Sequence, residues 1–280
     1  MLQKLALNSA IILTTIYLLG CLLLRWGQSR LIFFPDRQIK STPQKYGLDY
    51  QDVWLDLAED KVHGWWIPAV ESSAPALMYF HGNASNLGDL GEIAAIFHQL
   101  EVSVLLIDYR GYGQSSLKAP NEARVYEDAE AGWKYLTQTR KMPPEKIFVY
   151  GHSLGGAIAL DLAVKQPEMG GLITEGTFTS IEEMAGLSPI FKLFPLSWIV
   201  TQRFDSIDKI GSLQTPILIL HGTSDRVIPV LMAHKLFAAA PQPKQIEIFE
   251  QAGHNNLPEF GTEKYLPILK KFIDSEINDE

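Results

Sequence analysis

Short apolar runs alternate with longer segments of helical spacing along most of this 280-residue chain. The apolar runs cover residues 76–82, 102–111, 146–151, 171–176, 216–222 and 244–250. Several are apolar almost throughout, which is typical of strands covered by helices on both faces. The segments between them with helical length and spacing are residues 87–100, 121–139, 154–166, 230–240 and 257–277. This alternation predicts an α/β fold with a mostly parallel sheet.

The first two strands of the predicted sheet form a hairpin. Residues 52–57 and 62–67 both read as strands, and the polar segment 58–61 separates them as a turn. Together with the six apolar runs they predict an eight-stranded sheet with an antiparallel start and helices on both faces.

One connection is longer than a single crossover helix requires. Residues 177–215 contain several large apolar side chains, among them Phe178, Phe191 and Trp198. Long connections with apolar content of their own commonly close over a functional site. We therefore expect a small helical cap inserted at about residues 177–215. The alternative is an ordinary helix followed by a long loop.

The amino terminus carries the longest uncharged segment. No charge occurs between Lys4 and Arg25, and residues 5–24 are apolar apart from four polar side chains. As a helix, this run covers about 30 Å, the thickness of the hydrocarbon core of a bilayer. We expect residues 1–30 to form a single-pass membrane anchor, followed by one folded domain over residues 31–280.

Two alternatives remain for this segment. A signal peptide is one, because residues 18–21 (LLGC) resemble the lipobox at which bacterial lipoproteins are cleaved and acylated, here on Cys21. Residues 22–24 continue the apolar run where a lipoprotein normally turns polar. A helix packed against the protein itself is the other alternative. Three arginines follow the run by residue 37 and one lysine precedes it, which mildly favours a cytoplasmic carboxyl-terminal part but leaves the side of the membrane open.

Composition narrows the classes of function. Lys and Arg number 24 against 32 Asp and Glu, so a nucleic-acid partner is not expected, because such binding depends on clustered basic side chains. Cys21 is the single cysteine, which excludes an internal disulfide, and no Cys/His spacing resembles a zinc site. No dinucleotide-binding glycine motif follows a strand and no P-loop occurs. We expect no metal and no cofactor.

A candidate nucleophile stands between a predicted strand and a predicted helix. Residues 151–155 (GHSLG) match G-x-S-x-G, with Ser153 at the nucleophile position and a further glycine at 156. The motif needs small residues around the serine, because side chains at the glycine positions would collide in so tight a turn. Its place after the run 146–151 gives it the context that the motif requires.

A serine nucleophile needs a base, usually a histidine held by a carboxylate. Of seven histidines, His254 follows the last predicted strand and would lie at the same sheet edge as Ser153. Asp225 follows the run 216–222 and precedes His254, in agreement with the chain order Ser, Asp, His. Asp205 and Asp208 also lie between Ser153 and His254, but they fit a turn and a helix cap better.

The remaining histidines fit other roles. His152 lies inside the motif, and His81 and His221 precede glycines that shape loops. The others fit a hairpin or helix surfaces and are expected to be solvated: His63, His98 and His234.

The oxyanion of a tetrahedral intermediate needs two backbone donors. Leu154 follows the nucleophile and begins a helix, where N–H groups are unsatisfied and the dipole favours negative charge. The second donor is expected in the loop 81–86 (HGNASN), and we select Asn83. The alternative for Asn83 is a turn residue whose side chain only caps the next helix, a role that also suits Asn86.

The chain resembles a known family through six motifs taken together. They are HGNASN (81–86), DYRGYGQS (108–115), GHSLGG (151–156), TFTS (177–180), HGTSDRVIP (221–229) and AGHNN (252–256). Their order and spacing resemble the α/β-hydrolase superfamily, and especially the single-pass, membrane-anchored abhydrolase-domain serine hydrolases and their bacterial relatives, over about residues 32–273. The resemblance implies hydrolysis of esters or thioesters, with lipids or acylated proteins as substrates, and the superfamily also includes peptidase-like members.

These observations favour a membrane-associated serine hydrolase of acyl esters or thioesters with the triad Ser153, Asp225 and His254. An aminopeptidase-like hydrolase is an alternative. It would need an acidic group for the substrate amine, for which Glu175 and Glu182 are the nearest candidates. A scaffold that binds a lipid or a partner without catalysis is a third hypothesis, but binding alone requires none of the triad residues.

Overall fold

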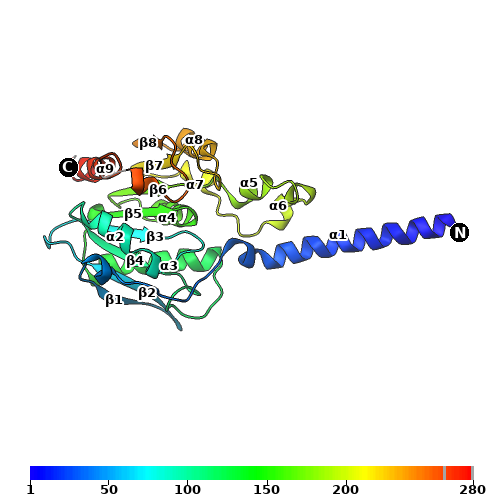
Figure 1. The fold of residues 1–280 in the computed structure, drawn as a ribbon, viewed down its shortest axis with the longest axis horizontal. Helices are drawn as coiled ribbons and strands as arrows, with labels where there is room; N and C mark the ends of the chain where they lie inside the picture. Colours follow the sequence, from blue (N-terminus) through cyan, green and yellow to red (C-terminus); the bar gives the residue numbers. More distant parts are fainter. Residues whose placement is uncertain (261–262, 279–280) are drawn as a thin grey trace.

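The fold is built on one eight-stranded sheet with the order β1-β2-β4-β3-β5-β6-β7-β8. The computed structural model in Figure 1 describes residues 1–260 and 263–278. The strands are β1 (Gln51–Leu57), β2 (Asp60–Ile67), β3 (Ala76–Phe80), β4 (Ser103–Ile107), β5 (Ile147–His152), β6 (Gly171–Glu175), β7 (Ile217–Gly222) and β8 (Lys244–Phe249). The pairs β1·β2 and β2·β4 are antiparallel, and the other five pairs are parallel. The predicted mostly parallel sheet with an antiparallel start is confirmed.

Helices cover both faces of this sheet, as predicted (Figure 1). The longer helices after the amino-terminal one are α2 (Gly91–His98), α3 (Glu122–Lys134), α4 (Leu154–Lys165), α8 (Val230–Ala239) and α9 (Tyr265–Asn278). In β3, Met78 and Phe80 belong to one buried cluster with α3, α4 and α8, and Leu77 and Tyr79 belong to a second cluster with α2 and α9. Every residue of β3 is buried, because successive side chains point to opposite, covered faces.

Two predicted helices are shorter in the structure. The segment 87–100 divides into a short 3-10 turn, η2 (Leu87–Asp89), and α2. Asn86 caps η2, since its Oδ1 accepts the N–H of Gly88 at 2.8 Å. The segment 257–277 begins with η6 (Leu257–Phe260), and α9 starts only at Tyr265. Pro267 explains this start, because proline is tolerated in the first turn of a helix but not in its interior.

The amino-terminal helix α1 (Leu2–Ile32) projects away from the sheet and its covering helices (Figure 1). It is long and apolar enough to cross a membrane, and residues 1–19 are exposed along it. This exposure argues against a helix packed throughout on the protein itself. An anchor and a signal sequence both remain consistent with its length and composition.

The long connection between β6 and β7 contains several short helices. They are α5 (Ile181–Gly186), η5 (Phe191–Leu193), α6 (Leu196–Ile199) and α7 (Ser206–Ile210). In Figure 1, α5 and α6 lie beyond the carboxyl ends of the parallel strands, on the same side as α1. The segment 177–215 thus contains the helices expected of a cap.

Candidate active site

Ser153 lies on a sharp turn between β5 and α4. Its backbone has φ 56° and ψ −118°, a conformation that side-chain-bearing residues rarely adopt and that is typically found at functional sites. A Cβ on Gly151 would approach the carbonyl oxygen of Gly155 to 2.2 Å, and one on Gly156 would approach Thr177 Oγ1 to 1.7 Å. The strained turn therefore depends on glycines at these positions.

Gly155 offers a direct test of this turn. A Cβ there would lie 2.0 Å from the carbonyl oxygen of Phe80, a backbone atom of the neighbouring strand that cannot rotate away. We expect Gly155→Ala to destabilise the fold by about 3 kcal/mol, at the upper end of ordinary overpacking. For a domain of this size the melting temperature should fall by about 10 °C. Thermal unfolding followed by circular dichroism measures the change.

Gly186→Ala is the matched control for this substitution. A Cβ at Gly186 meets no atom within 4 Å, and the residue ends α5 without a positive φ. We expect no loss of thermal stability in this variant. Equal melting temperatures for the two variants would contradict the packing account of the turn.

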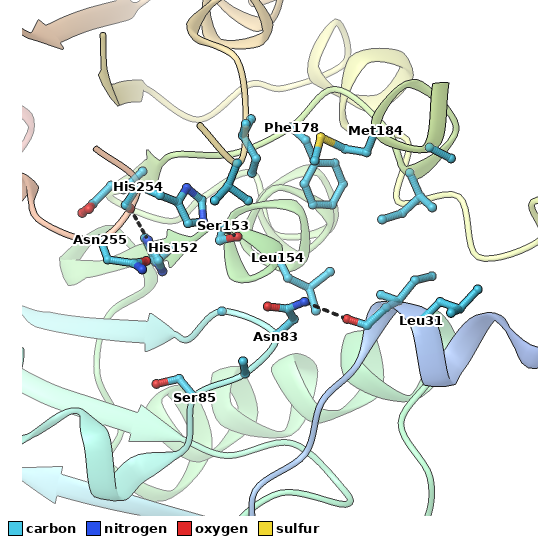
Figure 2. A pocket seen from close by; sticks show the side chains of 18 of the residues that line it. Leu31, Asn83, Ser85, His152, Ser153, Leu154, Phe178, Met184, His254 and Asn255 are labelled. Atoms are coloured by element: carbon cyan, nitrogen blue, oxygen red, sulfur yellow. Dashed lines mark hydrogen bonds between the residues drawn. The ribbon is translucent and has the colours of Figure 1, made fainter. Parts of the chain in front are cut away.

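The structure brings Ser153, His254 and Asp225 together. His254 Nε2 lies 3.0 Å from Ser153 Oγ, and His254 Nδ1 lies 2.7 Å from Asp225 Oδ2. Ser153 follows β5, Asp225 follows β7 and His254 follows β8, so the three side chains meet at the carboxyl edge of the parallel strands. Figure 2 shows Ser153 and His254 side by side at the cavity. The spacing matches that of a serine, a base and the carboxylate that orients it.

Asp225 is held as a charged group. Its side chain is 1% exposed, and its Oδ1 accepts the backbone N–H groups of Val227 and Ile228, both at 2.8 Å. Burial alone would raise the pKa of Asp225, but hydrogen bonds from His221, His254 and Ile228 outweigh it and bring the pKa well below its usual range. The carboxylate is therefore ionised at any pH near neutrality.

His221 is a contact of this carboxylate that the sequence did not reveal. Its ring is fully buried, with Nε2 2.8 Å from the carbonyl oxygen of Ile228 and 3.4 Å from Asp225 Oδ2. The sequence predicted only that His221 precedes a loop glycine. The sequence does carry a signal for this contact, because Asp225 follows His221 by four positions at the end of one strand.

Four further side chains near Ser153 were given other roles, or none, by the sequence. His152 Nε2 lies 3.0 Å from the carbonyl oxygen of His254, as the dashed line in Figure 2 shows, and burial lowers the pKa of His152. The Glu175 carboxylate is buried and accepts hydrogen bonds from the hydroxyls of Tyr150 and Tyr265. Because these contacts join different strands and helices, sequence spacing does not indicate them.

One expectation for a histidine was wrong. His63 is 1% exposed rather than solvated, because the sheet covers its ring and its Nε2 lies 2.8 Å from Asp52 Oδ1 on the paired strand β1. It lies in the hairpin, and its role there is structural.

The predicted oxyanion residues flank Ser153. Leu154 is the first residue of α4, and Gly82, next to Asn83, is so near that a Cβ there would lie 3.5 Å from Ser153 Cβ. The Asn83 side chain donates to the carbonyl oxygen of Ile32 at 3.0 Å (Figure 2). It therefore ties the loop to the end of α1 and does not cap the helix that follows, η2, which Asn86 caps. Within residues 1–260 and 263–278, no acceptor takes the backbone N–H of Asn83 or Leu154.

Two further contacts fix this loop. The carbonyl oxygen of Asn83 accepts the N–H of Phe34 at 3.0 Å and the hydroxyl of Tyr112 at 2.7 Å. Together with the bond from its side chain to Ile32, these contacts hold Asn83 in place through three hydrogen bonds. A rigid donor next to a reacting centre stabilises developing charge without reorganisation.

A cavity of about 770 Å³ opens at Ser153. Its walls come from the end of α1, the loop after β3, the helices α5 and α6, and the loops that carry Asp225 and His254. Most of the lining is apolar, and Figure 2 shows Phe178 and Met184 above Ser153 and Leu31 across from it. This volume fits a drug-sized or acyl-chain ligand.

No group of three or more His, Cys, Asp or Glu side chains suited to a metal ion occurs among the residues that the structure describes. The polar groups that face Ser153 are a histidine, a carboxylate behind it and backbone amides. Their chemistry is that of proton transfer and of binding a developing negative charge.

Comparison with known proteins assigns the family. The family model described as serine aminopeptidase, S33, matches residues 71–209 and 205–260, well over half of the chain. The chain belongs to the α/β-hydrolase superfamily. An uncharacterized protein of Mycobacterium tuberculosis is 31% identical to this hydrolase over 257 residues, which cover 91% of this chain and 90% of the relative.

Eukaryotic relatives match over a similar extent. The α/β-hydrolase domain-containing protein WAV2 of Arabidopsis thaliana is 31% identical over 279 residues, covering 91% of this hydrolase and 90% of its own chain. Protein bem46 of Schizosaccharomyces pombe is 35% identical over 235 residues, covering 79% and 76%. The predicted resemblance is therefore confirmed at the level of the family.

Solved structures agree on the fold. The Pyrococcus furiosus esterase Pf2001 has a TM-score of 0.72 at 20% identity and covers 87% of this hydrolase and 98% of the esterase. A Mycobacterium tuberculosis puromycin-hydrolyzing peptidase has a TM-score of 0.69 at 18% identity, covering 84% and 40%. Because an esterase and a peptidase both share the fold, these likenesses do not select the bond that is cleaved.

Proposed function

We propose that this α/β-hydrolase cleaves carboxylic esters or thioesters of acyl groups through an acyl-enzyme on Ser153. The observation that carries the proposal is the chain of contacts from Ser153 Oγ through His254 to Asp225, which faces an apolar cavity. A nucleophile, a base and an orienting carboxylate account for the chemistry, and the cavity accounts for the acyl group.

The first half of the proposed reaction forms the acyl-enzyme. His254 Nε2 takes the proton of Ser153 as Oγ attacks the carbonyl carbon, and Asp225 stabilises the imidazolium through Nδ1. The backbone N–H groups of Asn83 and Leu154 bind the oxyanion of the tetrahedral intermediate. When the intermediate collapses, the carbon–oxygen or carbon–sulfur bond breaks, and the leaving alcohol or thiol takes the proton from His254.

The second half returns the free enzyme. A water molecule loses a proton to His254 and attacks the acyl carbon of the ester on Ser153. The bond to Ser153 Oγ then breaks, Oγ recovers the proton, and the carboxylic acid leaves. No step in this sequence draws on a metal or a cofactor.

The polar contacts favour this function over an aminopeptidase. An aminopeptidase of this type would need an acidic side chain free to bind the substrate amine. The Glu175 carboxylate already accepts two tyrosine hydroxyls, and Glu182 on α5 lies 3.8 Å from the guanidinium of Arg203. The remaining lining near Phe178 and Met184 is apolar and suits an acyl chain better than a charged amine.

Comparing the hydrolysis of acyl esters and thioesters with that of aminoacyl amides tests the proposal. We expect measurable turnover of p-nitrophenyl esters and of acyl thioesters, and turnover of aminoacyl-naphthylamides at least about a hundredfold slower, since an unpaired ammonium in the apolar cavity is costly. Steady-state kcat/KM for each class is the measurement. Faster cleavage of aminoacyl-naphthylamides would favour the peptidase, and no turnover of any class would favour a non-catalytic scaffold.

We also propose the organisation of the chain into an anchor over residues 1–30 and a catalytic domain over residues 31–280, with a cap at about 177–215. The length, hydropathy and exposure of α1 support the anchor. The short helices of the cap that line the cavity support the insertion. The bilayer is then a partner of the protein, in addition to its acyl substrate.

The anchor predicts that the full-length chain stays in the membrane pellet after extraction with alkaline carbonate. Residues 5–24 have no charge and span the hydrocarbon core, so high pH should not release them. Mass spectrometry should find the peptide that contains Lys4 in this fraction. A mature chain that begins at or near Cys21 would instead identify a cleaved signal sequence, and release of the intact chain, with Lys4 still present, into the supernatant would exclude both.

A further inference from the structure

The tip of the cap, residues 187–199, exposes large apolar side chains. Leu187, Ile190, Leu193 and Trp198 are 48%, 67%, 71% and 80% exposed. Lys192 is the only charged residue among these thirteen, and its long side chain can carry its ammonium away from an apolar surface. A group of apolar side chains of this size marks a surface that contacts lipid or protein.

The cap tip lies against α1 rather than against the sheet. The Tyr17 hydroxyl donates to the carbonyl oxygen of Leu193 at 3.0 Å, and the ring of Tyr17 stacks on Phe194 with centroids 5.6 Å apart. Gly20 lies beside the same ring, where a Cβ would be 3.5 Å from Phe194. In Figure 1, α5 and α6 lie on the side of the domain from which α1 projects, and the first part of α1 continues beyond them.

Further contacts join the two segments towards the domain. Arg25 donates to the carbonyl oxygen of Trp198, and Gln28 Nε2 donates to that of Ile199 at 2.8 Å. The cap tip therefore follows α1 from Tyr17 to Gln28. Its backbone oxygens on that side receive donors from α1, which an apolar surrounding requires.

The depth of these contacts decides what surrounds the cap tip. Tyr17 precedes Arg25, the first charge after the apolar run, by eight residues, which is about 12 Å along a helix. If residues 5–24 cross the hydrocarbon core, a segment docked on Tyr17 and Gly20 lies well inside one leaflet. The exposed apolar side chains of the cap tip would then be surrounded by acyl chains.

We propose that the cap tip is embedded with α1 in one leaflet of the bilayer, and that the cavity receives its acyl chain directly from that leaflet. The cavity is lined by Leu24 and Leu31 of α1 and by Phe191 and Leu196 of the cap tip. In this proposal α1 and the cap tip, the two elements in contact with lipid, line the path by which an acyl chain reaches Ser153. The occupant of the exposed surface is lipid hydrocarbon, in continuity with the anchor.

This inference rests on the proposed anchor and acyl hydrolase, and its test separates them. Cys21 is the only cysteine, so a Cys21→Ser background allows a single label to be placed. Leu193→Cys and Val70→Cys each receive the fluorophore NBD, and the full chain is reconstituted in phosphatidylcholine vesicles containing doxyl-labelled lipid. Val70 is 90% exposed and precedes β3, at the ends of the parallel strands opposite to those that carry the site. It is therefore the matched control.

We expect doxyl lipid to quench the label at position 193 at least threefold more than the label at position 70. Equal, weak quenching at both positions would overturn the proposal. So would a label at 193 that lipid does not quench but that forms cross-links to a second copy of the chain, because the exposed surface would then be a protein interface. This readout needs no enzymatic activity, so a failure of the proposed reaction leaves it interpretable.

Activity supplies the second arm of the test. The double variant Ile190→Asp/Leu193→Asp should hydrolyse a long-chain ester embedded in vesicles at least tenfold more slowly, while its turnover of dissolved p-nitrophenyl acetate stays within twofold. Val70→Asp should leave both rates unchanged. Equal loss on both substrates by the double variant, or unchanged rates on both, would contradict entry of the substrate from the leaflet.

Discussion

Replacing Ser153 by alanine is expected to lower kcat for ester hydrolysis by about a millionfold, to the level left by binding and oxyanion stabilisation alone. Ser153 Oγ is the atom 3.0 Å from His254 Nε2, and alanine leaves no nucleophile at the turn. Activity is measured on p-nitrophenyl esters with the protein in detergent. The variant should keep the thermal stability of the parent, because only one hydroxyl is removed.

Ser188→Ala is the control for this substitution. Ser188 also lines the cavity, but it belongs to the cap segment, and the two ring nitrogens of His254 bind Asp225 and Ser153 instead. Its kcat should stay within about threefold of the parent value. An active Ser153→Ala variant, or equal losses in the two variants, would refute the assignment of Ser153 as nucleophile.

Replacing Asp225 by asparagine is expected to lower kcat by about 10⁴-fold with little change in the shape of the site. In the proposed mechanism Asp225 Oδ2 accepts a hydrogen bond from the N–H of His254 Nδ1, at 2.7 Å. An amide can present its N–H₂ group to Nδ1 instead, which favours the tautomer with the proton on Nε2. That tautomer cannot take a proton from Ser153.

Asp208→Asn is the matched control, since Asp208 also lies between Ser153 and His254 in sequence but sits exposed on α7. It should retain full activity. A full rate in Asp225→Asn, or an equal loss in Asp208→Asn, would contradict the role of Asp225.

Asp225 also predicts how stability depends on pH. Its pKa is lower in the folded protein than in the unfolded chain, where a carboxyl has a pKa of about 3.9. The charged side chain therefore stabilises the fold fully above that unfolded pKa and ceases to do so as pH falls through the lower folded value. Chemical unfolding of the parent and of Asp225→Asn should differ most above about pH 5 and converge in acid.

The sheet could be predicted from the sequence because its signals are local. Near-continuous apolar runs mark strands covered on both faces, and each of the eight predicted strands is found. The run 102–111 extends beyond β4 because Asp108, although buried, has left the strand and accepts the N–H of Leu87 at 3.0 Å. Apolar content alone does not show where such a strand ends.

The candidate site was accessible from sequence to the extent that its residues follow strand ends. Ser153, Asp225 and His254 each come directly after a parallel strand, and parallel strands end at one edge. The contact of His221 with Asp225 was missed although both residues belong to one strand end, and the contacts of Glu175 with Tyr150 and Tyr265 were missed because the two tyrosines come from other elements. The binding of Asn83 to Ile32 and the contact of the cap with α1 are long-range for the same reason.

The most direct test of the central claim is to map the adduct of a fluorophosphonate probe on the full-length protein by mass spectrometry. The account predicts one adduct, on Ser153, that requires native folding and that Ser153→Ala abolishes. Weaker labelling of Asp225→Asn under the same conditions would follow from the impaired base. An adduct on another residue, or a native protein that the probe does not label, would contradict the account.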